Sequence, residues 1–356
     1  MSNSLFNLKK ALSVFGADAT AKAASVELPA FSKNADNRTL KSWSSGDLSK
    51  VGEKVGFLPK LKSPIAASIF VTKGGVLKSS LTLNLARMAA LHGIRTCVVG
   101  LDMQGDVSTS LGETVGEALD EDDSLEEALA RVNSVKGLAQ VYLGEASLDD
   151  VLRPTDLPTL FYIPETPELV ALDQSLINRN RREYWLKEKV VTPLKREFDL
   201  VLIDCSPNWN RLITNALMAC DVLISPLECK INNFRNLTTF RALIQEFSQE
   251  MQTSFEHVFV PTRLVPNRKL SQEIRQWYGE NLSNCAKGSV RESIQGEESI
   301  AMRMSIPEYA PTSVAADEMR ALITELWTLF TATQKTKQTE ASSARHVGHQ
   351  APTLNV

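Results

Sequence analysis

Short apolar segments alternate with amphipathic ones along most of this chain, and this alternation constrains the fold more than any other feature of the sequence. Six apolar runs of four to seven residues are rich in Val, Ile and Leu: Ile65–Val71, Thr96–Leu101, Leu160–Ile163, Leu200–Ile203, Val222–Ser225 and His257–Val260. Most of them show no apolar-polar alternation. Such runs are typical of strands buried on both faces, as in a parallel sheet covered by helices.

Segments with helical periodicity separate these runs. In Lys78–His92, the apolar residues Leu81 and Leu85 share one helical face. The last such segment, Ser313–Phe330, also carries an apolar stripe and is expected to close the domain. The pattern predicts an α/β fold with a doubly wound, mainly parallel sheet flanked by helices, over residues 63–331.

The two ends of the chain have a different character. Residues 1–62 carry ten Lys or Arg against five Asp or Glu, so the overall charge of −3 leaves −8 for the remainder. Much of this negative charge lies in Glu113–Glu127, which contains eight acids. We expect residues 1–62 to form a basic N-terminal arm, partly helical around Leu5–Phe15 and Thr39–Val55, for which nucleic-acid contact stays open. Residues 332–356 are polar and predict a disordered tail.

The composition, with 43% hydrophobic and 23% charged residues, is typical of a soluble globular protein. No stretch approaches the roughly 20 apolar residues that a membrane-spanning helix needs. The N-terminus has no basic region followed by an apolar run, so we expect no secretory leader. The five cysteines form no CxxC pair. We therefore expect reduced core thiols in a cytosolic protein.

The segment after the first apolar run has the residue types of a phosphate-binding loop. A buried strand leads into a turn containing Gly74 and Gly75, and a helix opens near Lys78. Glycines let backbone N–H groups turn inward, and a helix N-terminus favours an anion. Lys78 is expected to neutralise the β- and γ-phosphates, and the hydroxyl of Ser79 to ligate Mg²⁺.

This segment, KGGVLKSS, resembles the deviant Walker A motif KGGVGKTT of the ParA/MinD family. Thr72 and Leu77 stand where the general pattern GxxxxGK[ST] has glycines. The serines keep the hydroxyl groups of the family motif, whereas the Cβ of Leu77 must tolerate the backbone geometry of the turn. Leu77 therefore puts the catalytic rate in doubt more than nucleotide binding. The resemblance implies that ATP is bound by Lys73, Gly74, Gly75, Val76, Leu77, Lys78, Ser79 and Ser80.

The resemblance also gives the first lysine of the motif a role between two chains. In this family the early lysine reaches across a dimer interface to the nucleotide of the partner, and Lys73 matches it by position. A cation supplied in trans would make ATP the link between two copies. The alternative is a surface charge on a turn.

Two carboxylates follow predicted strands. Asp102 lies in a segment that resembles the family motif DxDPQGN, in which Gly100 here replaces the first Asp. The resemblance implies that Asp102 positions the attacking water, with Asp106 as the rival candidate and a turn former as the alternative. Asp204 lies in a segment that resembles the Walker B motif YDYIIIDCPP. It would hold Mg²⁺ together with Ser79, through a water.

The likeness to ParA proteins spans roughly residues 65–329 and includes Asn215–Leu227, which resembles the family stretch NALxAAD–VIxPL. Thr262 and Arg263 stand where relatives contact adenine, although a structural turn is equally consistent. Further basic residues lie in the region that carries non-specific DNA contacts in ParA relatives, where positive charge alone would suffice. These DNA candidates are Arg268, Lys269, Arg275, Lys287, Arg291 and Arg303.

The resemblance implies an ATPase that uses Mg²⁺, with Lys73, Lys78 and Asp102 as catalytic residues. It implies a homodimer in the ATP state that binds DNA non-specifically at the nucleoid and partitions a plasmid, chromosome or other cargo. A ParB-like or adaptor partner would stimulate hydrolysis. A MinD-like membrane-cycling ATPase would need a basic amphipathic C-terminal helix. An iron–sulfur reductase would need cysteines spaced for a cluster. An operator-binding autoregulator that acts through the N-terminal arm is a further alternative.

Overall fold

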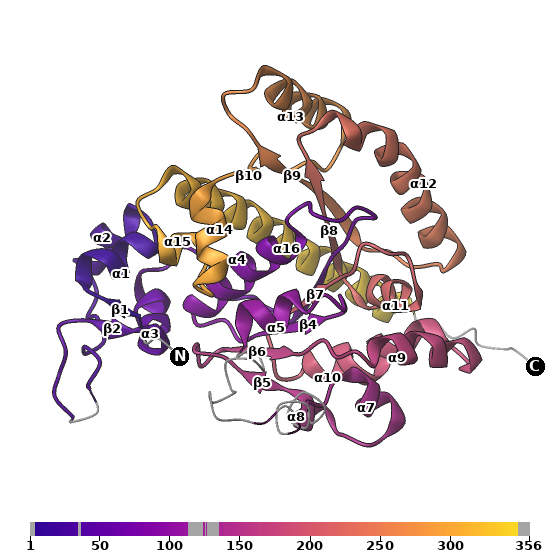
Figure 1. Ribbon diagram of the computed structural model, residues 1–356, viewed down its shortest axis with the longest axis horizontal. Helices are drawn as coiled ribbons and strands as arrows, with labels where there is room; N and C mark the ends of the chain where they lie inside the picture. The colour runs from indigo at the N-terminus through magenta and orange to yellow at the C-terminus, as the bar shows by residue number, and fades with distance from the viewer. Residues whose placement is uncertain (1–3, 35–36, 113–123, 125, 127–134, 348–356) are drawn as a thin grey trace, which may run out of the picture.

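The computed structural model describes residues 4–34, 37–112, 124, 126 and 135–347. Its centre is an eight-stranded sheet with helices on both faces (Figure 1). The strand order is β10-β9-β8-β3-β7-β4-β6-β5, and only β5 runs antiparallel to its neighbour. The strands are β3 (Ile65–Ile69), β4 (Thr96–Gly100), β5 (Arg153–Pro154), β6 (Leu160–Ile163), β7 (Leu200–Asp204), β8 (Val222–Glu228), β9 (Glu256–Leu264) and β10 (Val290–Arg291). The predicted α/β fold with a mainly parallel, doubly wound sheet is confirmed.

Alternate residues of the strands face two separate cores, so that Ala67 and Ile69 pack on one face of the sheet and Ala66 on the other. The first face is covered by α4 (Lys78–Leu91), α14 (Ile294–Ala301), α15 (Ile306–Tyr309) and α16 (Val314–Val347). The second face is covered by α9 (Leu169–Ser175), α11 (Arg211–Ala219), α12 (Phe234–Glu250) and α13 (Lys269–Asn281). The connections contain α5 (Asp106–Leu111), α7 (Leu138–Leu143), α8 (Leu148–Val151), α10 (Thr192–Leu194) and the short helices η2 (Leu176–Asn178), η3 (Arg182–Tyr184), η4 (Lys187–Val191) and η5 (Ile231–Asn233).

The N-terminal arm is folded against the domain, on the left in Figure 1. It contains β1 (Leu5–Phe6), α1 (Leu8–Val14), α2 (Asp18–Ala23), β2 (Trp43–Ser44) and α3 (Ser45–Val55). A Cβ on Gly52 of α3 would lie 1.9 Å from the carbonyl oxygen of Leu91, so only glycine allows α3 to approach α4 this closely. Trp327 of α16 donates from Nε1 to the carbonyl of Pro59 at 2.8 Å. The described residues of the arm thus pack against α4 and α16 of the domain. The domain boundary at residue 62 stays a prediction.

Helix α16 continues to Val347, past residue 331, where we expected the domain to end. Residues 332–347 contain no Gly or Pro and are rich in good helix formers, which sustain a helix without an apolar stripe. Gln334 is still buried and accepts from the backbone N–H of Lys62 at 3.2 Å. The rest of the predicted tail, residues 348–356, and most of the acidic stretch 113–127 lie outside the described residues.

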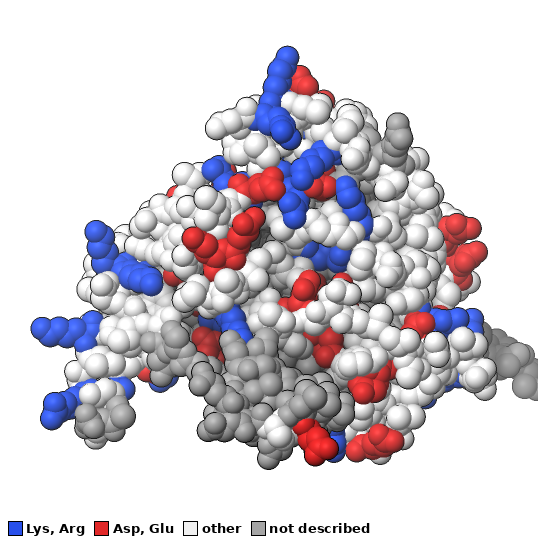
Figure 2. Space-filling view, in the orientation of Figure 1, with Lys and Arg blue, Asp and Glu red and all other residues white. Residues whose placement is uncertain are grey.

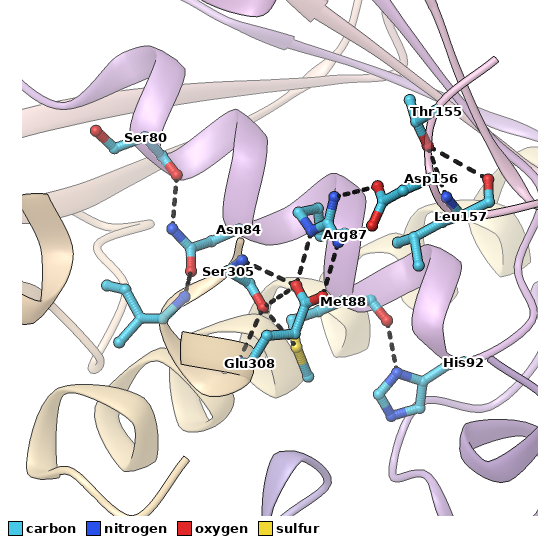
Figure 3. A network of polar contacts seen from close by, with 11 residues as sticks. Ser80, Asn84, Arg87, Met88, His92, Thr155, Asp156, Leu157, Ser305 and Glu308 are labelled. Atoms are coloured by element: carbon cyan, nitrogen blue, oxygen red, sulfur yellow. Dashed lines mark hydrogen bonds and ion pairs between the residues drawn. The ribbon is translucent and has the colours of Figure 1, made fainter. Parts of the chain in front are cut away.

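A buried ion-pair network anchors α4 in its second half (Figure 3). The Arg87 guanidinium donates to both oxygens of Glu308, from Nε and Nη2, at 2.8 Å each, and to Asp156 at 2.8 and 3.0 Å. Glu308 also accepts from the hydroxyl of Ser305 at 2.7 Å. The network fixes α4 to α15 and to the segment after β5. Among the described residues, no helix has the length and apolar character needed to span a membrane.

Candidate nucleotide-binding site

The loop between β3 and α4 is an open turn at a helix N-terminus. Gly75 has a φ of 72°, and a Cβ built on Gly74 or Gly75 would meet no heavy atom within 4 Å outside the adjoining residues. Helix α4 begins directly after the turn, at Lys78, and is 14 residues long. Backbone amides at the start of a helix favour an anion, and the space in front of these glycines is clear. The geometry suits the phosphate groups of a nucleotide.

Leu77 has the turn conformation that, in the sequence analysis, its Cβ was expected to have to tolerate. Its φ of 68° and ψ of 33° lie in the left-handed region, which glycine adopts freely. A side chain in this conformation costs about 1–2 kcal/mol. The Leu77 side chain packs partly buried against the core beneath α4, which offsets part of this strain. The loop therefore keeps the shape of a glycine turn without the glycine.

Lys78 is a buried cation beside the open turn. Only 7% of the residue is exposed, and its Nζ donates to the carbonyl oxygen of Lys73 at 3.3 Å. Across the part of the chain that the structure describes, no carboxylate forms an ion pair with it. Removing an ammonium group from water is costly unless it is paired. A bound phosphate would supply that pairing.

Asp204 ends β7 next to the start of α4 and accepts two hydroxyl hydrogen bonds. Ser79 donates to one carboxylate oxygen at 2.8 Å and Thr82 to the other at 2.8 Å. Burial raises the pKa of Asp204 to about 7, although the bonds from Thr82 and Ser79 oppose this rise. A buried carboxylate with adjacent hydroxyl oxygen is a donor set that fits Mg²⁺. The two predicted metal residues, Ser79 and Asp204, are thus in contact.

The two candidate water-positioning carboxylates lie on the turn after β4. Asp102 is 9% exposed and accepts from the backbone N–H of Gln104 at 3.2 Å, as a turn former does. Asp106, in the first turn of α5, accepts from the hydroxyl of Ser79 at 3.1 Å. The single hydroxyl proton of Ser79, a predicted metal ligand, is therefore shared between Asp106 and Asp204. The choice between the two for water positioning stays a prediction.

Lys73 pairs within its own chain. Its Nζ lies 2.7 Å from Oε2 of Glu228, at the end of β8, and Lys230 lies 2.7 Å from the other oxygen. Burial would raise the pKa of Glu228, but hydrogen bonds from Lys230 and Lys73 outweigh it and hold the pKa below its usual value. The predicted role of Lys73 toward a second chain would require it to leave Glu228.

Thr262 and Arg263, at the end of β9, support the back of the loop. The hydroxyl of Thr262 donates to the carbonyl of Val76 at 3.0 Å, and Nε of Arg263 donates to that of Gly75 at 2.6 Å. Beside them lies a pocket whose lining includes Leu77, Ser80, Asn84, Arg263, Glu292 and Ser293. Both residues belong to β9 itself, so they are part of a strand and not of a turn, and their contact with adenine stays a prediction.

The six DNA candidates do not form one group. Lys269 is the most open, with 91% of its side chain exposed, and pairs with Glu273 at 3.6 Å. Arg268 occupies the N-cap position of α13 without a side-chain capping bond, and Arg275 of α13 donates to the carbonyl of Lys287. Arg291 forms a bidentate ion pair with Glu318 of α16, and Arg303 donates to Thr109. Figure 2 shows basic groups over α13, β9 and β10 with acidic groups among them.

The sequence did not indicate three polar residues of this region: Thr82, Glu165 and Glu228. Thr82 follows Ser79 by three residues and so faces the same side of α4, a spacing that could have revealed it. Glu165 and Glu228 each lie at or just beyond the end of a strand predicted to be parallel. Only the strand order, which periodicity does not determine, brings Glu165 to the turn after β4 and Glu228 to the phosphate loop.

Comparison with known proteins agrees with this fold. The family AAA_31, described as AAA domain, matches residues 65–257. The chromosome partitioning protein ParA of Myxococcus xanthus is 32% identical over 158 residues, 44% of this chain and 50% of that protein. The chromosome-partitioning ATPase Soj of Treponema pallidum is 28% identical over 222 residues, 61% and 80% of the two chains.

Among solved structures, cobyrinic acid a,c-diamide synthase from Mycobacterium smegmatis, with a bound ATP analogue and magnesium, has a TM-score of 0.58 at 22% identity. It covers 73% of this chain and 93% of its own, and this likeness concerns the fold alone. The chain belongs to the AAA domain family and, within it, to the ParA-like P-loop proteins of the ParA/MinD superfamily. The two relatives named above are described as a chromosome partitioning protein and a chromosome-partitioning ATPase.

Proposed function

We propose that this chain is a partition ATPase that binds ATP at the loop between β3 and α4, dimerises in that state and then binds DNA non-specifically. The observation that carries the proposal is the buried, carboxylate-free Lys78 beside an open glycine turn, with Ser79 and Asp204 in contact next to it. A phosphate chain would pair the cation and fill the turn.

The residues around the turn would divide the work of hydrolysis. Lys78 and the loop amides would hold the β- and γ-phosphates, and Asp102 or Asp106 would orient a water toward the terminal phosphate. Ser79 and Asp204 would hold Mg²⁺. The ion would neutralise phosphate charge during transfer. Thr82 orients the Asp204 carboxylate through its 2.8 Å hydrogen bond.

Dimer formation would require a change at Lys73. Its 2.7 Å ion pair with Glu228 holds the ammonium group on its own chain. Glu228 keeps a second cation, Lys230, at 2.7 Å, so it would not be left unpaired if Lys73 moved. Lys73 could then reach the nucleotide of the partner, as the resemblance to the family implies.

DNA contact would involve the basic residues at α13. Arg268 and Lys269 lie at its start, and Lys269 is largely exposed. One such patch makes few phosphate contacts, so two patches on one dimer would bind much more tightly. Partner-stimulated hydrolysis would separate them and release the DNA.

The test measures ATP hydrolysis, and binding to random-sequence duplex DNA with ATP, with ADP and without nucleotide. We expect slow hydrolysis and salt-sensitive DNA binding with ATP only. Arg268→Ala/Lys269→Ala should weaken DNA binding, whereas Lys189→Ala, at an exposed lysine on η4, should not. Equal binding in all three nucleotide states, or none, would refute the ATP-gated DNA function. Nucleotide-dependent binding to liposomes would then favour the membrane-cycling alternative, and a protected operator in footprinting would favour the autoregulator.

A further inference from the structure

A carboxylate from a neighbouring strand occupies the space beside Gly100, at the end of β4. A Cβ built on Gly100 would lie 2.3 Å from Cδ and 2.6 Å from Oε1 of Glu165. The φ of Gly100 is not in the left-handed region, so its backbone would accept a side chain. Glycine is needed here because Glu165, which follows β6, reaches across the end of β4.

Glu165 binds the turn that carries Asp102 and Asp106. One carboxylate oxygen accepts from the backbone N–H of Val107 at 3.0 Å. The other accepts from the backbone N–H of Ser108 at 3.0 Å and from its hydroxyl at 2.5 Å. Charge-assisted bonds to two successive amides fix the start of α5 more firmly than neutral bonds would. The half-buried carboxylate therefore sets where this turn lies.

The turn held by Glu165 is hydrogen-bonded to Ser79, one of the two predicted magnesium ligands. Asp106, one residue before Val107, accepts from the hydroxyl of Ser79 at 3.1 Å, and Ser79 donates to Asp204 at 2.8 Å. The contacts therefore run without a gap from Glu165 to α4. In β-sheet register, Gly100 lies opposite Asp204 itself.

We propose that Glu165 is a positioning residue for ATP hydrolysis, because its carboxylate, reaching over Gly100, holds the turn of Asp102 and Asp106 toward the phosphate loop. This inference rests on the proposed ATPase function. In the motif that this segment resembles, DxDPQGN, the residue at the position of Gly100 is an aspartate and carries the carboxylate itself. Here the same space receives its carboxylate from the segment after β6.

The role differs from that of a residue that binds nucleotide. The hydrogen bonds of Glu165 go to Val107 and Ser108 and not to the glycine turn or Lys78, so its loss should leave the phosphate cradle intact. Displacing a group that orients a reactant by about 1 Å can slow a reaction roughly 100-fold. We therefore expect Glu165→Ala to lower kcat by about 10- to 100-fold. The dissociation constant for ATP should stay within about threefold of the wild type, a change of at most about 0.7 kcal/mol.

The decisive variant moves the carboxylate back to β4. Gly100→Asp alone would clash with Glu165 and should destabilise the protein. Gly100→Asp/Glu165→Ala removes the clash and places a carboxylate in the same volume. We expect this double variant to recover at least a third of the wild-type kcat. Glu168→Ala, at an exposed acid on the same segment, is the matched control and should behave as the wild type.

The experiment measures kcat, KM and binding of a fluorescent ATP analogue with the full-length chain. Should Glu165→Ala not fold, Glu165→Gln takes its place, because it keeps the shape and can still accept from one amide. A folded variant with wild-type kcat, or one that loses binding and rate in parallel, would overturn the inference. So would a folded double variant no faster than Glu165→Ala. A wild-type chain that binds ATP and never hydrolyses it would instead refute the proposed function.

Discussion

Helix α4 carries two buried basic side chains whose surroundings are opposite. Arg87, 1% exposed, is held between Glu308 and Asp156 (Figure 3). Lys78, 7% exposed, has a backbone carbonyl and an open turn in front of it. Burial alone would lower the pKa of Arg87, but the two carboxylates raise it above its normal value. A buried charge that its own chain neutralises stabilises the fold, whereas one that faces open space is available to a ligand.

The largest expected effect, on ATPase activity, is at the N-terminal end of α4, where Lys78 faces the open turn. Lys78→Met should lower kcat/KM for ATP at least about 100-fold, because the phosphates lose their buried cation. The free energy of unfolding should stay the same or rise, since a buried charge without a carboxylate partner is removed. Steady-state ATPase assays and urea unfolding measure the two quantities. A clear loss of stability with activity retained would reverse the comparison.

In the second half of α4, where carboxylates surround Arg87, Arg87→Met should behave in the opposite way. It leaves Glu308 buried without its cation, so the free energy of unfolding should fall by about 3–5 kcal/mol. Urea unfolding by circular dichroism measures this change. Arg87→Met/Glu308→Gln, which removes both charges, is the control and should recover part of the loss. A change below about 1 kcal/mol in Arg87→Met would show that the network contributes little to stability.

Lowering the pH should destabilise the fold at the C-terminal end of α4, where His92 lies. Burial lowers the pKa of His92, which makes edge-to-face ring contacts with Phe15 and Phe57, to about 4. Between pH 6.5 and 4 the unfolded chain binds a proton at this residue that the folded chain excludes. Stability should therefore fall as the pH is lowered through this window, by roughly 2–3 kcal/mol for this residue.

Thermal unfolding from pH 8 to pH 4 measures the slope. His92→Gln does not titrate and should flatten it in part. His257→Gln serves as the control for the remainder, because burial also lowers the pKa of His257, to about 3. A slope that neither substitution changes would contradict the assignment.

The smallest effect concerns Leu77. Leu77→Gly and Leu77→Ala both remove the packed side chain, but only the glycine relieves the left-handed backbone. Leu77→Gly should therefore be more stable than Leu77→Ala by about 1 kcal/mol. Chemical denaturation of the two variants measures the difference. Equal stabilities would mean that the loop relaxes when the side chain is absent.

The positions of the central strands could be predicted from the sequence, because buried parallel strands are continuous apolar runs. Leu160–Ile163 was expected as a strand and is β6. The two-residue edge strands β5 and β10 were missed, since pairing at an edge needs only backbone and leaves no pattern in the side chains. The end of α16 was also missed, because helix propensity without an apolar stripe was interpreted as disorder.

For the site, local sequence indicated what lies within one loop and one helix. Leu77 was recognised as a position that needs an unusual backbone, and it has one. Glu165 could not be recognised, because the need for Gly100 becomes clear only when β6 lies beside β4. Lys73 shows the same limit, since its partner Glu228 comes from another strand. Contacts between strands depend on their order, which periodicity does not determine.

The packing of the N-terminal arm has a practical consequence for expression and purification. A shortened protein that starts at residue 63 would contain the whole predicted ATPase domain. It would also uncover the apolar surface that Phe15 and other arm residues shield, together with Trp327, whose indole N–H bonds to Pro59. Newly exposed apolar surface of this kind promotes self-association. Such a fragment should aggregate more readily than the 356-residue chain, so loss of activity on truncation would say nothing about the arm as a regulator.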